Sequence, residues 1–186
     1  MRIISGKYKG RRITAPKKLP VRPTTDLSKE SLFNILNNSY HFSALTVLDL
    51  FSGTGNISYE FGSRGAQHIT AVDGHYGCVK FITQTAADFE LPIQAIKSDV
   101  YSFLERAGGT YDIIFADPPY GFEADKFEKI AQLVFQHKLL NPGGTLIIEH
   151  SKHTPLDHLP ELTNSRKYGG SIFSFFTNEE AGDEEE

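Results

Sequence analysis

The stretch LTVLDLFSGTGN, residues 45–56, places a short apolar run directly before a glycine-rich turn. A run of this length is typical of a strand buried on both faces, and the glycines permit a tight turn into a helix. Further short apolar runs follow at residues 68–72, 93–99, 111–117 and 144–150, separated by helix-length amphipathic segments such as 123–138. Strands that alternate with helices predict an α/β fold with a doubly wound, mostly parallel sheet.

The two ends of the chain depart from this alternation. Residues 2–13, RIISGKYKGRRI, have two short alternating stretches around SGKYKG and predict a small N-terminal β-hairpin, which a basic linker containing prolines joins to the rest. Thr25 or Asp26 can cap a helix that continues through Leu36. Near the C-terminus, SRKYGGSIFSFF (165–176) predicts a final antiparallel pair of strands, with its alternating Phe residues in the core.

Charge is distributed unevenly along the 186 residues, whose net charge is −4. Eight of the 19 Lys and Arg residues fall within the first 22 positions, and the last eight residues, EEAGDEEE, contain six acids. We therefore divide the chain into a basic N-terminal hairpin and linker (1–24), a main domain (25–178) and an acidic tail that we expect to be disordered (179–186).

The composition argues against several classes of protein. No window approaches the ~20 apolar residues that span a bilayer, and the N-terminus lacks an apolar signal core, so we expect a cytoplasmic protein. Cys78 is the single cysteine, which excludes an internal disulfide. No cysteine or cluster of acids joins His150, His153 and His158, so we expect no metal site. We expect a monomer.

A nucleoside-containing cofactor is predicted at the end of the first strand. Gly53 and Gly55 allow a ligand to approach the backbone, and Asp73, at the end of the second predicted strand, can accept hydrogen bonds from both ribose hydroxyls. Ser58 stands where a dinucleotide site would have a third glycine, and Asp49, at the mouth of the turn, would repel phosphates. S-adenosyl-L-methionine has no phosphate and carries two cationic groups, so Asp49 favours this methyl donor.

The second predicted centre is FADPPYGF, residues 115–122, at the end of the fourth strand. Neither proline has an N–H, and each has a fixed φ, so the corner presents acceptors in set directions. If the Asp117 carboxylate and the Pro118 carbonyl accept the two N–H bonds of an exocyclic amine, its lone pair faces the methyl donor. Tyr120 offers a face on which the base can stack. The corner therefore predicts transfer of a methyl group to a nucleobase amine.

These motifs together resemble a known family. DLFSGTGN, the acid of AVD, SDV and DPPY resemble class I S-adenosylmethionine-dependent methyltransferases, which have a Rossmann-like fold. The flanking segments MRIISGKYKGRRI, RPTTDLSKESLFNIL and KYGGSIFSFF narrow the resemblance to the RsmD family of bacterial 16S rRNA guanine-N2 methyltransferases. This resemblance implies that guanine 966 of 16S rRNA is methylated at N2 during small-subunit assembly, on free rRNA or on an assembly particle.

The resemblance also implies roles for individual residues. Asp49, Gly53 and Gly55 form the methionine side of the cofactor site, and Asp73 binds the ribose. Asp99 contacts the adenine amine and Val100 covers the edge of the adenine ring. The expected site residues are, for catalysis, Asp117, Pro118 and Tyr120; for the cofactor, Asp49, Phe51, Gly53, Gly55, Asn56, Asp73, Asp99 and Val100; and for RNA, Lys7, Tyr8, Lys9, Arg11, Arg12, Arg22 and Thr24.

The basic N-terminal residues are expected to release counterions from RNA phosphates, and Tyr8 is expected to stack on an unpaired base. We expect deletion of residues 1–20 to weaken RNA binding and leave cofactor binding nearly unchanged. Family members usually carry arginine where Leu27 and Lys29 stand here, so some phosphate contacts are expected to be absent or moved.

Two other functions remain open from the sequence. Asp-Pro-Pro-Tyr suits any planar exocyclic amine, so an adenine-N6 methyltransferase acting on DNA or RNA is the nearest alternative. An RNA-binding assembly factor without turnover is the other, although the presence of Asp73 and Asp117 argues against it.

Overall fold

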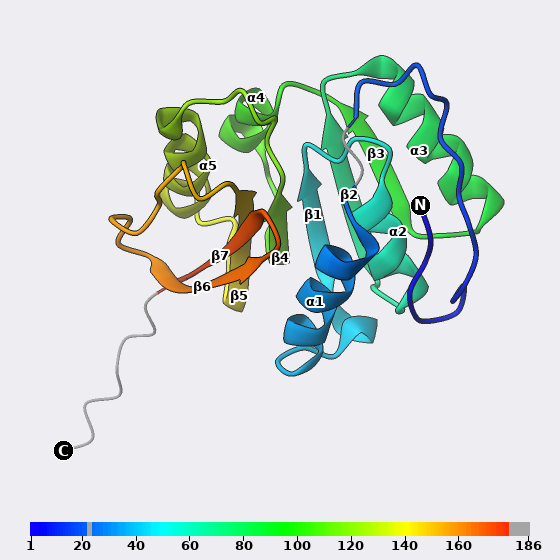
Figure 1. Cartoon of the computed structure of the whole chain (residues 1–186), viewed down its shortest axis with the longest axis horizontal. Coiled ribbons are helices and arrows are strands. Elements are labelled where there is room, and N and C mark those ends of the chain that lie inside the picture. Colours follow the sequence, from blue (N-terminus) through cyan, green and yellow to red (C-terminus); the bar gives the residue numbers. More distant parts are fainter. Residues whose placement is uncertain (22–23, 179–186) are drawn as a thin grey trace.

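The structure is a computed structural model that describes residues 1–21 and 24–178. Its centre is a seven-stranded sheet in the order β3-β2-β1-β4-β5-β7-β6 (Figure 1). The strands are β1 (Thr46–Leu50), β2 (His68–Asp73), β3 (Ile93–Lys97), β4 (Tyr111–Ala116), β5 (Leu140–His150), β6 (Leu162–Tyr168) and β7 (Ser171–Thr177). The first five run parallel, and β7 is antiparallel to both of its neighbours. The predicted sheet is confirmed.

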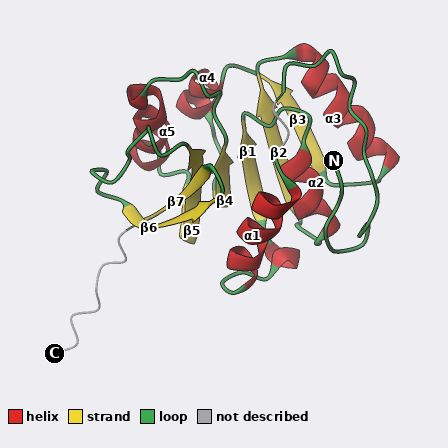
Figure 2. Ribbon diagram, in the orientation of Figure 1, coloured by secondary structure: helices red, strands yellow, loops and turns green. Residues whose placement is uncertain are grey.

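Helices cover both faces of this sheet, as Figure 2 shows. The helices are α1 (Asp26–Asn37), α2 (Asn56–Ser63), α3 (Tyr76–Asp88), α4 (Val100–Arg106) and α5 (Ala124–Gln136), with a short 3-10 helix η1 (Phe42–Ala44). The predicted cap of α1 is present, because the Thr25 hydroxyl accepts a hydrogen bond from the Ser28 N–H at 3.1 Å.

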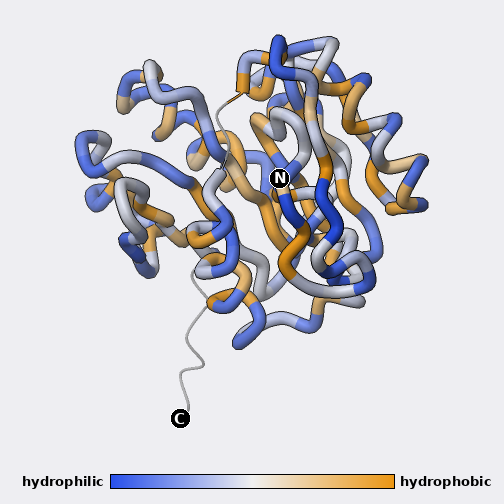
Figure 3. The backbone as a smooth tube through the Cα atoms, turned by 45° about the vertical axis from the view of Figure 1, so that its right-hand side comes forward, coloured by the Kyte–Doolittle hydropathy of each residue, from blue (hydrophilic) through white to orange (hydrophobic). Residues whose placement is uncertain are grey.

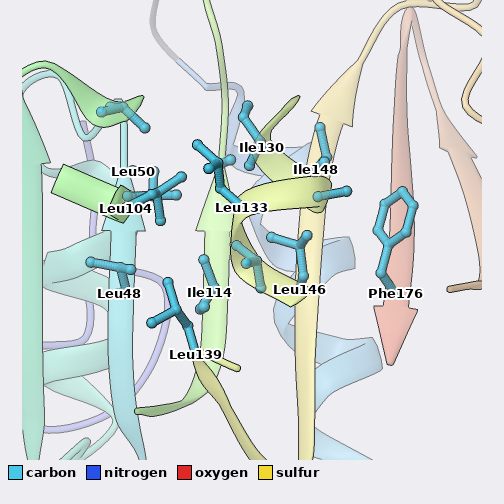
Figure 4. Packing of buried hydrophobic residues seen from close by; sticks show 14 of the residues in the cluster. Leu48, Leu50, Leu104, Ile114, Ile130, Leu133, Leu139, Leu146, Ile148 and Phe176 are labelled. Carbon is cyan, nitrogen blue, oxygen red and sulfur yellow. The ribbon is translucent and has the colours of Figure 1, made fainter. Parts of the chain in front are cut away.

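Side-chain alternation along the strands divides the core into two layers. On one face, Leu48, Leu50, Ile114, Leu146 and Ile148 pack against α4 and α5 (Figure 4). On the other face, the alternate residues of the same strands pack against α1 and α2. Because parallel strands are apolar toward both faces, the hydrophobic stretches of the chain concentrate along the strands in the interior (Figure 3). This arrangement fixes the carboxyl ends of β1, β2 and β4 side by side.

The N-terminal segment, residues 1–21, packs on the outside of α2 and α3 (Figure 1). Ile3 and Ile13 are buried there together with Tyr59 and Ile82. The predicted hairpin forms only in part: its antiparallel pairing is the single bridge between Arg2 and Arg12, supported by a hydrogen bond from the Ile13 N–H to the Met1 carbonyl at 2.9 Å. Further backbone hydrogen bonds, such as that from the Ile3 N–H to the Arg11 carbonyl at 2.9 Å, and side-chain burial against the helices hold this segment together.

The two edge strands of the sheet are β3 and β6. Five successive residues of β6, from Thr163 to Lys167, are exposed, whereas its neighbour β7 buries Phe173, Phe175 and Phe176. Within the described ranges, no helix has the length and apolar character that crossing a membrane requires.

Candidate active site

A pocket of about 660 Å³ opens at the carboxyl ends of β1, β2 and β4. This is where ligands bind in open α/β sheets, and the volume is suitable for a nucleoside-sized molecule. The pocket brings together the predicted residues Asp49, Phe51, Gly53, Asn56, Asp73, Asp99, Val100, Asp117, Pro118 and Tyr120. The two centres that the sequence predicts separately therefore share one cavity.

The turn between β1 and α2 forms one wall of this pocket. Phe51 has a φ of 55°, and Gly53 and Gly55 have φ values of 56° and 90°, so three residues of the turn lie in the left-handed region. Gly55 does not line the cavity. A Cβ at this position would lie 2.7 Å from the Tyr59 ring, so close packing of the turn against α2 explains the glycine.

Asp73 connects the end of β2 to this turn. One carboxylate oxygen accepts a hydrogen bond from the Gly53 N–H at 2.9 Å, and the other accepts one from the His75 N–H at 2.8 Å. A carboxylate has about four acceptor positions, so both oxygens retain capacity for a ligand hydroxyl. Asp73 can therefore hold the turn and bind a ribose at the same time.

Asp49 lies at the base of the pocket rather than at its mouth, because only 1% of the residue is exposed. Its Oδ2 accepts a hydrogen bond of 2.6 Å from the Ser58 hydroxyl. Burial raises the pKa of Asp49 to about 7, opposed by the hydrogen bonds from Ser58 and reinforced by the charge of Asp73. The position at the end of β1 was predicted, but its burial was not.

Asp99 and Val100 border the pocket where α4 begins. The Asp99 carboxylate caps this helix by accepting a hydrogen bond from the Ser102 N–H at 3.0 Å. Val100 is buried, and the half-buried Phe51 packs edge-on against Tyr101 at 6.4 Å between ring centroids. This part of the pocket combines an acceptor with an apolar wall, which suits a purine carrying an exocyclic amine.

The Asp117–Tyr120 corner follows β4 directly, and β4 pairs with β1 so that Ala116 lies opposite Leu50. Asp117 is partly exposed, Pro118 is buried and Tyr120 is 65% exposed at the rim. The carbonyl of Pro119 accepts a hydrogen bond from the Phe122 N–H at 3.1 Å and so closes the turn. The corner therefore presents a carboxylate and an aromatic face beside the cofactor pocket.

A second, smaller recess continues from this corner toward β5. Asp117, Pro118 and Tyr120 line it together with Glu149 and His150. Ala116 and Ile148 are register partners on β4 and β5, so Asp117 and Glu149 are neighbouring residues at the same edge of the sheet. Glu149 is 3% exposed. The sequence analysis missed this second carboxylate, although its place at the end of the fifth apolar run resembles that of Asp117.

The N-terminal segment supplies another wall of the pocket. Residues 15–17, 19–21 and Thr24 line the cavity opposite the strand ends. The side chain of Val21 lies 3.1 Å from the position that a Cβ on Gly53 would occupy. These contacts argue against the expectation that deleting residues 1–20 would leave cofactor binding nearly unchanged, because the deletion would remove part of the pocket wall.

The predicted RNA-contacting side chains differ in their surroundings. Lys7, Lys9, Arg11 and Arg12 are exposed, and the Arg11 guanidinium lies over the Phe89 ring at 5.1 Å. The Tyr8 ring packs edge-on against Phe89 with 5.1 Å between centroids, and its hydroxyl donates to the Phe89 carbonyl. Tyr8 therefore anchors the segment, and its stacking on RNA stays a prediction. Arg22 lies outside the described residues.

Family members usually carry arginine where Lys29 stands, so some phosphate contacts were expected to be absent or moved here, and the structure places this side chain in the interior. The residue is 0% exposed, and its Nζ lies 3.7 Å from Oε2 of Glu60, which is also 0% exposed. In α1, Lys29 shares a stripe with Leu32, Phe33 and Leu36, all of which are buried. That spacing is the sequence signal that could have indicated burial.

Histidine contacts differ from those of a metal centre. His150 approaches the Ser174 hydroxyl through Nε2 at 2.7 Å, and His158 forms a hydrogen bond of 2.7 Å with the Glu128 carboxylate. In residues 1–21 and 24–178, no three or more His, Cys, Asp or Glu side chains gather as metal ligands would.

Comparison with known proteins identifies the family. Residues 1–177 match the model of the family described as Conserved hypothetical protein 95. The chain belongs to this family. Family membership covers the N-terminal segment, the methyltransferase-like sheet and the C-terminal strand pair.

Several relatives carry names of rRNA methyltransferases. The chain is 32% identical over 173 residues to the Putative rRNA methyltransferase YlbH of Bacillus subtilis, which covers 90% of this chain and 92% of that protein. It is 26% identical over 187 residues to the Ribosomal RNA small subunit methyltransferase D of Escherichia coli K12, which covers 98% of this chain and 92% of that protein.

Solved structures agree with the fold. The putative methyltransferase yhhF from Escherichia coli superposes with a TM-score of 0.83 at 25% identity, covering 95% of this chain and 96% of that chain. A putative methyltransferase complexed with SAH, SMU.776, has a TM-score of 0.66 at 19% identity, covering 82% of this chain and 50% of that chain. The predicted class I methyltransferase fold is confirmed.

Proposed function

We propose that this family member transfers a methyl group from S-adenosylmethionine to the N2 amine of a guanine in 16S rRNA, at position 966 by resemblance. The observation that carries the proposal is the shared pocket, in which the Asp117–Pro118 corner borders the cofactor-binding turn at Gly53. The names of the relatives, Ribosomal RNA small subunit methyltransferase D, support small-subunit rRNA as the substrate. An rRNA substrate in turn implies action in the cytoplasm.

S-adenosylmethionine supplies an electrophilic methyl group on a sulfonium. Asp117 and the Pro118 carbonyl hold the two N–H bonds of the amine, so that its lone pair points at the methyl carbon. A nitrogen–carbon bond forms as the carbon–sulfur bond breaks. The electron pair of the broken carbon–sulfur bond stays on sulfur. One amine proton is then acidic and leaves to Asp117 or to water. Tyr120 offers the exposed ring on which the base stacks.

The neighbouring carboxylates of Asp117 and Glu149 support guanine over adenine. Guanine has two adjacent donors, the N1–H and the N2 amine, on one edge. Adenine instead has an acceptor at N1 beside its N6 amine, which a second carboxylate would repel. The adenine-N6 function therefore remains the second candidate but is less well matched to this pair of acids.

The N-terminal residues 1–24 support RNA contact in the same proposal. Lys7, Lys9 and Arg12 are exposed on the segment that also walls the cofactor pocket. Cations on this surface would bind phosphates on either side of a base that enters the pocket. The remaining domain, residues 25–178, would carry the chemistry.

The test is to incubate the protein with labelled S-adenosylmethionine and unmethylated small-subunit particles, naked 16S rRNA or duplex DNA. Digestion to nucleosides and mass spectrometry then identify the product. N2-methylguanosine at one position is the expected result. Methyladenine would support the alternative enzyme, and cofactor binding without transfer to any substrate would support an assembly factor.

A second measurement addresses guanine directly. RNA with 2-aminopurine at the target position keeps the 2-amino group and replaces the N1–H donor with an acceptor. We expect the wild type to methylate it at least ~10-fold more slowly than guanine, and Glu149→Gln to reduce this difference because an amide can donate to N1. Equal discrimination in both proteins would contradict a role for Glu149 in base selection.

A further inference from the structure

Lys29 joins three parts of the chain at one buried point. Its ammonium donates to the carbonyl of Arg2 in the N-terminal segment, and to Oδ1 of Asn56 in α2 at 2.9 Å. The third neighbour is the carboxylate of Glu60, at 3.7 Å. Two hydrogen bonds and one ion-pair contact therefore compensate the ammonium, as a charge removed from water requires.

Glu60 holds the N-terminal segment from the other side. Its carboxylate accepts hydrogen bonds from the Ile4 N–H at 3.0 Å and from the Ser5 N–H at 3.2 Å. It also accepts one from Arg64 Nε at 3.1 Å, one turn further along α2. Burial lowers the pKa of Lys29, while Glu60 raises it, so the ion pair favours the charged ammonium in an otherwise unfavourable position.

Asn56 connects this centre to the cofactor pocket. It is the first residue of α2, and it is one of the residues that line the pocket. A lysine ammonium can only donate hydrogen bonds, so it must face the carboxamide oxygen of Asn56 and never its nitrogen. The NH₂ group of Asn56 is therefore directed away from Lys29. Without Lys29, a rotation about the last side-chain bond would exchange the two ends of the amide.

We propose that Lys29 is a positioning residue for cofactor binding. It holds the Asn56 carboxamide so that the NH₂ group donates to the carboxylate at the amino-acid end of S-adenosylmethionine. The N-terminus of α2 favours an anion at the same place, through its unpaired N–H groups and its dipole. The proposal rests on the cofactor of the proposed function but needs no RNA.

The same ammonium ties the cofactor pocket to the surface proposed to bind RNA. Lys29 binds the Arg2 carbonyl on one side and Asn56 on the other, and α1 lies beside α2 (Figure 1). A change in the placement of residues 1–5 would therefore act on the Asn56 amide through a single side chain.

A purely structural role for the ion pair would affect every ligand of the pocket equally. We therefore compare S-adenosylhomocysteine with 5′-methylthioadenosine, which has the same adenosine and sulfur but no amino-acid end. The variants are Asn56→Ala, the double variant Lys29→Met with Glu60→Gln, and all three changes combined. Neutralising both partners together avoids leaving Lys29 or Glu60 charged without the other, and an amide oxygen at position 60 can still accept hydrogen bonds from Arg64. Calorimetry gives both dissociation constants, and urea unfolding shows that each variant is folded.

We expect Asn56→Ala and the double variant each to raise the dissociation constant of S-adenosylhomocysteine about 5- to 10-fold. The dissociation constant of methylthioadenosine should rise less than 2-fold. The triple variant should bind S-adenosylhomocysteine only slightly more weakly than Asn56→Ala does, because Lys29 acts through Asn56. Equal loss of both ligands, additive effects, or an unchanged affinity of Asn56→Ala for S-adenosylhomocysteine would overturn the proposal. Asn56→Ala alone decides if the double variant does not fold. A wild type that binds neither ligand would instead refute the cofactor, and both proposals with it.

Discussion

The N–H of Gly53 donates a hydrogen bond of 2.9 Å to the Asp73 carboxylate, which joins the β1–α2 turn to the end of β2. The two residues are 20 positions apart in the sequence and lie on the same wall of the pocket. The acid that is predicted to bind a ribose is thus also the acid that shapes the turn, so its removal should affect the cofactor in two ways.

Asp73→Asn should therefore weaken the binding of S-adenosylhomocysteine by at least about 10-fold. The amide can accept a hydrogen bond at only one end, so either Gly53 or His75 would face an NH₂ group. Calorimetry measures the dissociation constant. Asp88→Asn, which changes an exposed acid of α3, is the matched control and should bind as the wild type does. Similar affinities for both variants would contradict the assignment of Asp73.

Asp117→Ala should reduce turnover by on the order of 10² to 10³ fold while cofactor affinity is largely kept, because the carboxylate acts on the amine in the transition state. Single-turnover methylation of rRNA and binding of S-adenosylhomocysteine measure the two quantities separately. The control is Asp125→Ala, an exposed acid in the first turn of α5. A mild effect on turnover would mean that another group holds the amine.

The raised pKa of Asp49, about 7, predicts a pH-dependent effect of Asp49→Asn on stability. In the unfolded chain an Asp carboxyl titrates near ~3.9. Between these two pKa values the folded protein keeps a proton that the unfolded chain releases. The free energy of unfolding therefore falls as pH rises to about 7. Asp49→Asn, which can still accept from Ser58, should gain relative stability from pH 4 to 7 and change no further above 7. Urea unfolding of the cofactor-free proteins tests this, and a constant difference would contradict it.

The same titration should appear in cofactor binding. Ionised Asp49 attracts the cationic groups of the cofactor, so wild-type affinity for S-adenosylmethionine should rise with pH through about 7. Asp49→Asn should remove this rise, and calorimetry between pH 5.5 and 8 compares the two proteins. A rise that persists in the variant would assign the titration to another group.

Gly55→Ala should destabilise the protein by roughly 2 kcal/mol or more. The residue has a φ of 90°, and the new Cβ would lie 2.7 Å from the Tyr59 ring. Gly108→Ala is the control, because that glycine has no neighbour within 4 Å and its φ is not positive. Urea unfolding gives both free energies. Equal stabilities would show that the turn can relax around a side chain.

Replacing Lys7, Lys9 and Arg12 together with Gln should reduce the slope of log affinity for rRNA against log salt by about 2, since each lost phosphate contact changes this slope by roughly 0.7–0.9. The three side chains are exposed, so the fold should be kept. Lys138→Gln is the control. Lys138 is exposed and comes just before β5, so it lies at the end of the strands opposite the pocket. An unaltered slope in the triple variant would remove the N-terminal segment from the RNA contact.

The strand pattern was predictable because each buried parallel strand is a short apolar run between amphipathic helices. The prediction for β5 began four residues late, since Asn141, Pro142 and Gly143 read as a loop, whereas the strand extends to Leu140 through a shift in its register with β4. Local sequence cannot show such a shift, because the pairing with Tyr111 sets it.

The candidate site was predictable where it depends on strand ends, as for Asp49, Asp73 and Asp117. The wall formed by residues 15–21 was not, because a basic linker with prolines has the same composition whether it crosses a pocket or extends into solvent. The burial of Lys29 was missed because lysine is rarely buried without a partner, and its partners Arg2 and Glu60 are 27 and 31 positions away in the sequence. Only the fold brings them together.

The polar strand β6 has a consequence for the protein in a crowded cell. A margin of a sheet offers unpaired N–H and C=O groups to which a strand of another molecule can add. Here that margin carries Arg166 and Lys167 among five consecutive exposed residues, while the phenylalanines of β7 lie one strand further in. If the β6 edge strands of two copies came together, their like charges would repel. The charged edge strand β6 therefore opposes self-association into aggregates.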